Sequence, residues 1–293
     1  MELLSNLVNA LSLGSIYAII ALGYTMVYGI AKMLNFAHGD VIMVGAYASF
    51  VGYYSLGLHP LLALGAAMVV CTALGLLIER LAYRPLRSAP SLSVLITAIG
   101  VSYLLQNGAL LLFGANPKSY QSIVTIPALH LFGGRLTVTG ETIVNVSVCL
   151  LVMLGLTLFT SRTRTGKAMR AVSEDRQAAE LMGISVNRTI AVTFAIGSAL
   201  AAVAGVLYCS KTPTLSPTTG SVPGIMAFTA AVLGDIDSIP GTLVGGLLLG
   251  LIEILGTAYI NQDLAKAIVF GVLILILLVK PNGLLGKAVT EKV

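Results

Sequence analysis

Nine apolar runs occupy most of this 293-residue chain, and eight of them approach or reach the length needed to cross a bilayer. A bilayer core about 30 Å thick needs roughly 20 apolar residues in α-helix, or about 17 at the short end. The runs make the chain 57% hydrophobic and 10% charged, whereas soluble domains have about a quarter of their residues charged. We therefore expect an all-α, polytopic transmembrane helical bundle that forms one domain over residues 1–293. The expected spans number about nine, within a range of eight to ten: 7–29, 41–57, 61–78, 91–113, 142–160, 189–210, 222–234, 241–260 and 265–279.

Basic residues indicate the orientation of this bundle. With the N-terminus outside, thirteen of the 17 Lys and Arg residues fall in cytoplasmic segments: at Lys32, in 79–90, in 161–188 and in the C-terminal tail. Because cytoplasmic loops carry an excess of Lys and Arg, we expect the N-terminus outside and the C-terminus inside. The run 7–29 has no basic stretch before it and exceeds the usual signal-peptide core, so we expect it to be a retained span.

The seventh run, 222–234, has only thirteen residues and could be a half-helix that meets the next span inside the membrane. A purely re-entrant segment would turn the lysine-containing tail outward, so we interpret 222–234 as a crossing. Small residues four apart let helix backbones approach closely in lipid. They predict close helix pairs at Gly197/Ala201/Gly205, Gly241/Gly245 and Gly246/Gly250.

Two polar interruptions, Asn35–Asp40 and Gly234–Thr242, separate apolar runs in the two halves of the chain. A helix break at membrane depth persists only where protein or a water-filled path satisfies the backbone. Paired breaks of this kind point to a transport path. The candidate path residues are Asn35, His38, Gly39, Asp40, Asp235, Gly241 and Glu253.

Two interpretations of the first interruption are open. His38 titrates near neutral pH and could pair with Asp40 in a proton relay. Alternatively, both lie in a cytoplasmic turn, where Asp40 favours the dipole of the next helix and Asn35 bonds the local backbone; we favour this turn role for Asp40. Glu253 lies mid-span and should face the bundle interior or a wet cavity, either in a packing network or along the path.

The segment 161–188 is the long cytoplasmic loop. Ser173 is a suitable N-cap, Glu174 and Asp175 suit a first helical turn, and Gly183 suits the stop, which predicts a polar helix of about nine residues. Ala178, Leu181 and Met182 are expected towards one side of it. A helix this short needs support in water, so it docks either on the bundle or in the groove of a soluble partner.

The chain lacks the motifs of a nucleotide-binding protein or an enzyme. Gly166-Lys167 and Gly286-Lys287 are each followed by Ala, and neither has a Gly five residues earlier, so any ATP is bound by another chain. Cys71, Cys149 and Cys209 lie in expected spans without a CxxC spacing and are interpreted as packing residues. No catalytic or metal-binding arrangement stands at usable spacing, so we expect neither an enzyme nor a cofactor bound by this chain.

Several stretches resemble one known family: "LGSIYAIIALGYTMVYGIAKMLNFAHGD", "IERLAYRPLRS", "TAIGVSYLLQN", "TGKAMRAVSEDRQAAELMGI", "AFTAAVLGDIDSIPGTLVGGLLLGLIE" and "KPNGLLG". The family is the membrane permease subunits of branched-chain amino acid ABC importers. The resemblance implies a Type II importer fold in the inner membrane of a prokaryote. It also implies a second, related permease subunit (heterodimer or homodimer), two cytoplasmic ATPases that use ATP, and a periplasmic or lipid-anchored substrate-binding protein.

The same resemblance maps a coupling helix onto Ser173–Gly183, with Gly166–Ala171 as its lead-in. The ATPase-coupling residues that it implies are Gly166, Arg170, Ser173, Glu174, Asp175, Arg176 and Gly183. One departure is that Asp235 and Asp237 stand where relatives usually have glycine.

Other functions are open. A related ABC permease could carry urea, short amides or a simple sugar. A proton-coupled secondary transporter would use His38, Asp40 and Glu253, and a passive channel would need no partner.

Overall fold

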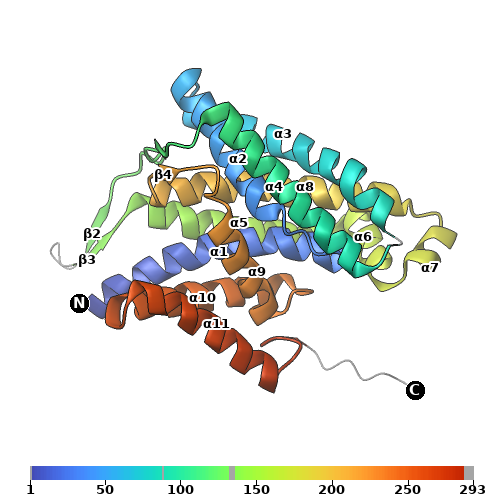
Figure 1. Cartoon of the computed structure of the whole chain (residues 1–293). Coiled ribbons are helices and arrows are strands. Elements are labelled where there is room, and N and C mark those ends of the chain that lie inside the picture. The colour runs from blue at the N-terminus through green and yellow to red at the C-terminus, as the bar shows by residue number, and fades with distance from the viewer. Residues whose placement is uncertain (1, 88, 132–135, 287–293) are drawn as a thin grey trace.

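The computed structural model describes residues 2–87, 89–131 and 136–286. Arg135, Lys287 and Lys292, which enter the orientation count, lie outside them. The described residues form helices joined by turns and loops, together with two small strand pairs (Figure 1). The helices are α1 (Glu2–Ala31), α2 (His38–Phe50), α3 (Pro60–Ile78), α4 (Ser91–Phe113), α5 (Gly140–Arg162), α6 (Arg164–Glu174), α7 (Arg176–Leu181), α8 (Val186–Lys211), α9 (Ser221–Gly234), α10 (Ile239–Tyr259) and α11 (Gln262–Val279).

Each of the nine expected spans coincides with a helix. Seven are long and apolar enough to cross a membrane: α1, α3 with its extension to Leu86, α4, α5, α8, α10 and α11. The other two, α2 and α9, have 13 and 14 residues. α2 continues into a π-helical turn, η1 (Val51–Ser55), and α3 continues into η2 (Glu79–Tyr83) and η3 (Arg84–Leu86). The seven long helices make this a multi-pass membrane protein. Its unusual feature is that two apolar helices, α2 and α9, are each too short to cross a bilayer alone.

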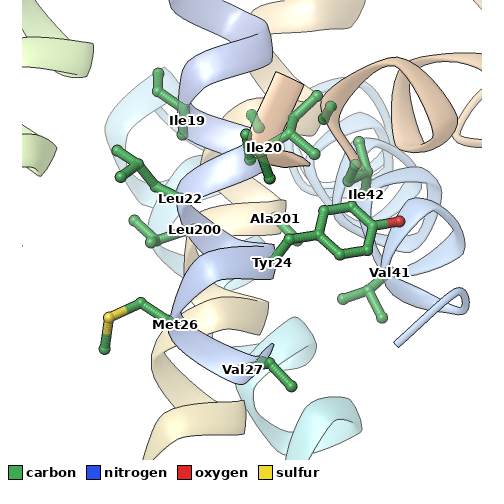
Figure 2. Close-up of a cluster of buried hydrophobic side chains, with 14 of the residues drawn as sticks. Ile19, Ile20, Leu22, Tyr24, Met26, Val27, Val41, Ile42, Leu200 and Ala201 are labelled. Carbon is green, nitrogen blue, oxygen red and sulfur yellow. The ribbon is translucent and has the colours of Figure 1, made fainter. Parts of the chain in front are cut away.

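The helix α1 lies at the centre of the bundle. Its most apolar window is 89% buried and that of α8 is 72% buried, against 17% for α4 and 11% for α11. In Figure 1, α1 runs between α10 and α11 on one side and α2, α3 and α4 on the other. Figure 2 shows α1 side chains packed between Val41 and Ile42 of α2 and Leu200 and Ala201 of α8. The outer helices keep apolar faces uncovered, as expected of a bundle that lies in lipid.

The small-residue pairs predicted from the sequence are close helix contacts. A Cβ atom added to Gly246 would lie 2.6 Å from Cα of Ala18, and one added to Gly250 would lie 2.4 Å from Cα of Gly14. α10 therefore packs on α1 backbone to backbone. Similarly, a Cβ added to Gly205 of α8 would lie 2.4 Å from the carbonyl oxygen of Ile42 in α2. Since lipid provides no hydrophobic force between helices, such approaches supply the dispersion contacts that hold them together.

Two short antiparallel strand pairs lie outside the helices. β1 (Lys118–Ser119) pairs with β4 (Thr214–Leu215), and β2 (Leu129–Leu131) pairs with β3 (Leu136–Val138). The first pair ties the segment after α4 to the link between α8 and α9. It thereby fixes the chain just before α9 begins.

Candidate functional site

The break after α1 is present where the sequence predicted it. α1 ends at Ala31, Lys32 takes a positive φ of 49°, and α2 starts at His38 without a side-chain cap among the described residues. The Asn35 side chain is buried and accepts a hydrogen bond from the Tyr83 hydroxyl at 2.9 Å. The predicted bond from Asn35 to its local backbone is therefore wrong, because η2 supplies the partner instead.

The proposed pairing of His38 with Asp40 is also absent. His38 is buried against the ring of Tyr24, with centroids 4.7 Å apart, and neither ring nitrogen has a hydrogen-bond partner in the described part of the chain. A Cβ at Gly23 would meet Nε2 of His38 at 2.5 Å, so Gly23 makes room for the imidazole. Residues two apart on a helix point in different directions, which is why His38 and Asp40 do not meet.

Asp40 does lie in the first turn of α2, as the turn interpretation predicted, but it is buried rather than in an open loop. Its Oδ1 accepts a hydrogen bond from Nε2 of Gln106 at 2.9 Å. The same nitrogen lies 3.3 Å from the hydroxyls of Ser102 and Ser221. Gln106 thus joins α2, α4 and α9.

The start of α9 meets the start of α2. A Cβ on Gly220 would lie 1.8 Å from the carbonyl oxygen of Gly39, and one on Gly224 would lie 2.8 Å from its Cα. Gly39 was predicted to line the path, whereas Gly220 and Gly224 were not singled out. Near this crossing the two long helices also touch, at Gly23 of α1 and Gly197 of α8. Two half-length helices therefore begin together beside the central helix pair.

α2 and α9 run away from this crossing in opposite directions. The hydroxyl of Tyr54, in the turn η1 that continues α2, bonds the backbone of Gln121 beside β1, on the face where α8 ends. The link from α9 to α10 holds Asp237, whose Oδ1 lies 2.7 Å from Nζ of Lys32 at the end of α1. The chain therefore enters the bundle from opposite faces in residues 32–37 and 212–220, and each half-helix continues to the face opposite its entry.

This geometry corrects the predicted pair of interruptions. Gly234–Thr242 covers the end of α9, the turn 235–238 and the start of α10, and it is not the counterpart of Asn35–Asp40. The counterpart is the link 212–220 before α9. The sequence analysis missed this link because residues 212–220 contain no charged residue that would mark a break. Asp235 lies in the α9–α10 turn and Gly241 lies in the first turn of α10, both away from the crossing. Asp235 has φ 130°, a conformation that favours glycine, which agrees with the glycine expected in relatives.

A cavity of about 330 Å³ opens beside the crossing. Its polar wall holds Asp40, Gln106, Ser102 and Ser221, while Phe36, Ile99 and Ile225 provide apolar surface. Figure 2 shows Tyr24, which also lines the cavity, reaching from α1 towards α2. Of these residues the sequence identified Asp40. A glutamine inside an apolar run, Gln106 in "VSYLLQNGA", is the signal that could have found the rest.

Glu253 lies elsewhere, on α10. It is half-buried, it faces the buried phenol of Tyr17, and Lys211 and Lys266 are its basic neighbours. Its Oε2 is buried and has no hydrogen-bond partner in the described residues. Glu253 does not line the cavity at the crossing.

The loop 161–188 forms two helices rather than one. Ser173 is not an N-cap: it lies in the last turn of α6, and its hydroxyl bonds the carbonyl of Arg170. Helix α6 continues through it because Gly166, Met169 and Val172 form a buried face at helical spacing. Asp175 is the N-cap of α7, accepting bonds from the amides of Gln177 and Ala178 at 2.8 and 3.0 Å.

α7 is six residues long, and Gly183 with φ 81° follows it, as predicted for the stop. Its buried residue is Ala179, whereas Leu181 and Met182 are 89% and 82% exposed. The side chain of Arg176 donates a hydrogen bond to the carbonyl oxygen of Ala31, the last residue of α1. The loop thus contacts the start of the 32–37 break.

A helical bundle in which two half-helices begin together at a buried polar cavity has the architecture of a membrane permease. The chain belongs to the family described as "Branched-chain amino acid transport system / permease component", whose family model matches residues 6–278. It is therefore a permease component.

The similar proteins are also named as permease proteins. The chain is 46% identical to the high-affinity branched-chain amino acid transport system permease protein BraD of Pseudomonas aeruginosa, over 99% of this chain and 98% of BraD. It is 44% identical to the high-affinity branched-chain amino acid transport system permease protein LivH of Escherichia coli strain K12, over 99% of this chain and 97% of LivH. The ribose import permease protein RbsC of the same strain is 27% identical, over 93% and 85%.

One solved structure shares the fold. A chain of PsaBC from Streptococcus pneumoniae in complex with Fab matches with a TM-score of 0.50 and 15% identity, over 92% of this chain and 89% of that chain.

Proposed function

We propose that this chain carries branched-chain amino acids across the inner membrane as one permease subunit of a Type II ABC importer. The single observation that carries the proposal is the crossing of α2 and α9 at Gly39 and Gly220, with its polar cavity, in a chain of this family. Broken helices that meet within a bundle leave backbone groups and dipole ends for a transported solute.

The proposed topology has nine crossings, with the N-terminus outside. In it, α1 runs inward, residues 32–37 return to mid-membrane and α2 continues outward. Residues 212–220 enter from outside and α9 continues inward. This assignment places α6, α7 and the end of α1 in the cytoplasm, together with most of the basic residues.

A second permease subunit closes the cavity in this proposal. Ile99, Tyr103 and Ile225 border the cavity and are 44%, 62% and 52% exposed, so it opens on the α4–α9 face. Lipid cannot satisfy a carboxylate such as Asp40, whereas a second subunit or a wet path can. We place the translocation path between the two subunits at this face, with Asn35, His38 and Gly39 beside it.

Power comes from two cytoplasmic ATPases, because this chain has no phosphate loop. The exposed tip formed by Leu181 and Met182 docks on the ATPase, and the charged residues Glu174 and Asp175 set its register. The hydrogen bond from Arg176 to the Ala31 carbonyl transmits movement of α7 to the bundle. This contact lies next to the break between α1 and α2, and Asp40 stands in the first turn of α2. The segment from Gly166 through Arg170 to Gly183 is thus the proposed coupling element.

The test is leucine uptake into proteoliposomes that contain the assembled importer and its substrate-binding protein. Uptake should need ATP and survive collapse of the proton gradient. Failure to move leucine while moving urea, an amide or ribose would refute the substrate, and uptake that stops with the proton gradient would refute the ATP-driven class.

The coupling element has its own test. Leu181→Ala with Met182→Ala should abolish stimulation of ATP hydrolysis by the loaded binding protein and should lower uptake in proportion. Leu111→Ala with Leu112→Ala, at two residues of α4 that are 87% and 80% exposed, is the matched control and should leave both unchanged. Normal coupling in the Leu181/Met182 variant would exclude this tip as the docking surface.

A further inference from the structure

We propose that the cavity at the α2–α9 crossing binds the charged head group of an α-amino acid, with Asp40 accepting its ammonium group. The permease would then select its solute independently of the binding protein. This inference rests on the proposed function, since the solute must carry an ammonium group.

Asp40 has no cationic partner in the described part of the chain. The residue Asp40 is 2% exposed, and no Lys or Arg is among the described residues that line the cavity. Its hydrogen-bond donors in the structure are neutral groups, the Gln106 amide and the Ser102 hydroxyl. A buried carboxylate inside a membrane bundle is costly unless a positive charge compensates it, and a transported ammonium group can do so.

Gln106 has more acceptors than hydrogens. Its Nε2 carries two hydrogens, but Oδ1 of Asp40, the Ser102 hydroxyl and the Ser221 hydroxyl all lie within 3.3 Å. At least one serine oxygen therefore receives no hydrogen from Gln106, and the Ser102 hydroxyl is itself a donor to the Asp40 carboxylate. The arrangement is a wall of neutral polar groups around one carboxylate.

Tyr24 and Gly39 offer donors for the ligand's carboxylate, because both residues also line the cavity. The Tyr24 hydroxyl has no hydrogen-bond partner among the described residues. The backbone N–H of Gly39 is not bonded to backbone there. The starts of α2 and α9 have no side-chain caps, so both present positive dipole ends to an anionic group.

The size and the remaining walls of the cavity fit a small apolar side chain. About 330 Å³ is near the lower end for ligand cavities, which run from about 300 to 1,000 Å³. Phe36, Ile99 and Ile225 would contact the aliphatic part of the ligand. A branched-chain amino acid has this combination of a zwitterionic head and a compact apolar tail.

The first experiment measures transport by the complete importer in proteoliposomes. Asp40→Asn keeps the shape but removes the charge, and should lower leucine uptake about ten-fold while ATP hydrolysis stimulated by the loaded binding protein continues. Asp40→Glu should recover part of the uptake. Asp263→Asn, at an exposed carboxylate in the first turn of α11, is the matched control and should be unchanged.

A second experiment uses the wild-type permease–ATPase complex without the binding protein, so it stands even if the Asp40 variants do not assemble. L-leucine and 3-methylbutylamine, which keeps the ammonium group, should raise its unfolding temperature; 4-methylpentanoate, which lacks it, should not. Equal stabilisation by the acid and the amine, or wild-type uptake by Asp40→Asn, would overturn the inference. If the wild-type importer moved no leucine at all, the proposed function itself would fail.

Discussion

Gly220 provides the sharpest test of the crossing between the half-helices. Its backbone angles, φ −80° and ψ −16°, are ones that alanine adopts without strain, so Gly220→Ala adds only a steric demand. The new Cβ would lie 1.8 Å from the carbonyl oxygen of Gly39, and ordinary contact begins at 3.4 Å. The start of α9 must therefore retreat by about 1.6 Å, the difference between these distances.

The clash is with a backbone atom, which cannot rotate out of the way as a side-chain atom can. Overpacking of this kind costs about 1–3 kcal/mol. It also separates Ser221 from Gln106, whose contact is already 3.3 Å. We expect the unfolding temperature of the purified protein to fall by several degrees and leucine uptake to fall by more than the loss of folded protein explains.

The matched control is Gly271→Ala in α11, where an added Cβ meets no atom within 4 Å. It should leave uptake and the unfolding temperature unchanged or slightly raise the latter, because alanine is the better helix former. Both quantities are measured on the same preparations, by thermal unfolding in detergent and by uptake in proteoliposomes. Wild-type behaviour of Gly220→Ala would show that the two helix starts are not in backbone contact.

Two further predictions concern the α9–α10 turn. Asp235→Gly should raise the unfolding temperature by a few degrees, because φ 130° costs a non-glycine residue about 1–3 kcal/mol; a decrease would mean that the bond from the Asp237 amide to its carboxylate, at 3.1 Å, outweighs the strain. The Lys32–Asp237 pair is 43% and 51% exposed, so a double-mutant cycle with Lys32→Ala and Asp237→Ala should give a coupling free energy below about 1 kcal/mol that decreases with salt. A larger, salt-independent coupling would show that this pair is shielded from solvent.

The helices could be predicted from the sequence to a large extent. The run 91–113 coincides with α4 residue for residue, and the small-residue pairs at Gly246 and Gly250 are contacts with α1. Both follow from the same condition: lipid offers no hydrogen-bond partners to the backbone and no hydrophobic force between helices. Apolar length and small residues therefore carry most of the information on the fold.

The loop shows where local signals fail. Ser173 and Asp175 are both good N-cap residues, and nothing local decides between them. The choice depends on Met169 and Val172, which are buried in the bundle and keep α6 helical through Glu174. Tertiary packing thus places the N-cap at Asp175, two residues after the predicted Ser173.

The candidate site was predicted in part. Asn35–Asp40 was identified as a break because charge and amide groups interrupt an apolar chain, and Asp40 does line a cavity. Gln106, which bonds Asp40, and Ser221, which bonds Gln106, were not identified, since they lie 66 residues and more from Asp40 along the chain and are ordinary within their own helices.

The sequence by itself determined that this chain lies in a membrane, where its helices run, which family it resembles and where its first helix breaks. These properties depend on the free energy of moving each segment from water into lipid and on the hydrogen bonding of its backbone, and both are local to the segment. Only the tertiary structure decided that the second break lies before α9 and that both half-helices start at Gly39 and Gly220. That meeting depends on distances between segments about 180 residues apart, which no local periodicity encodes.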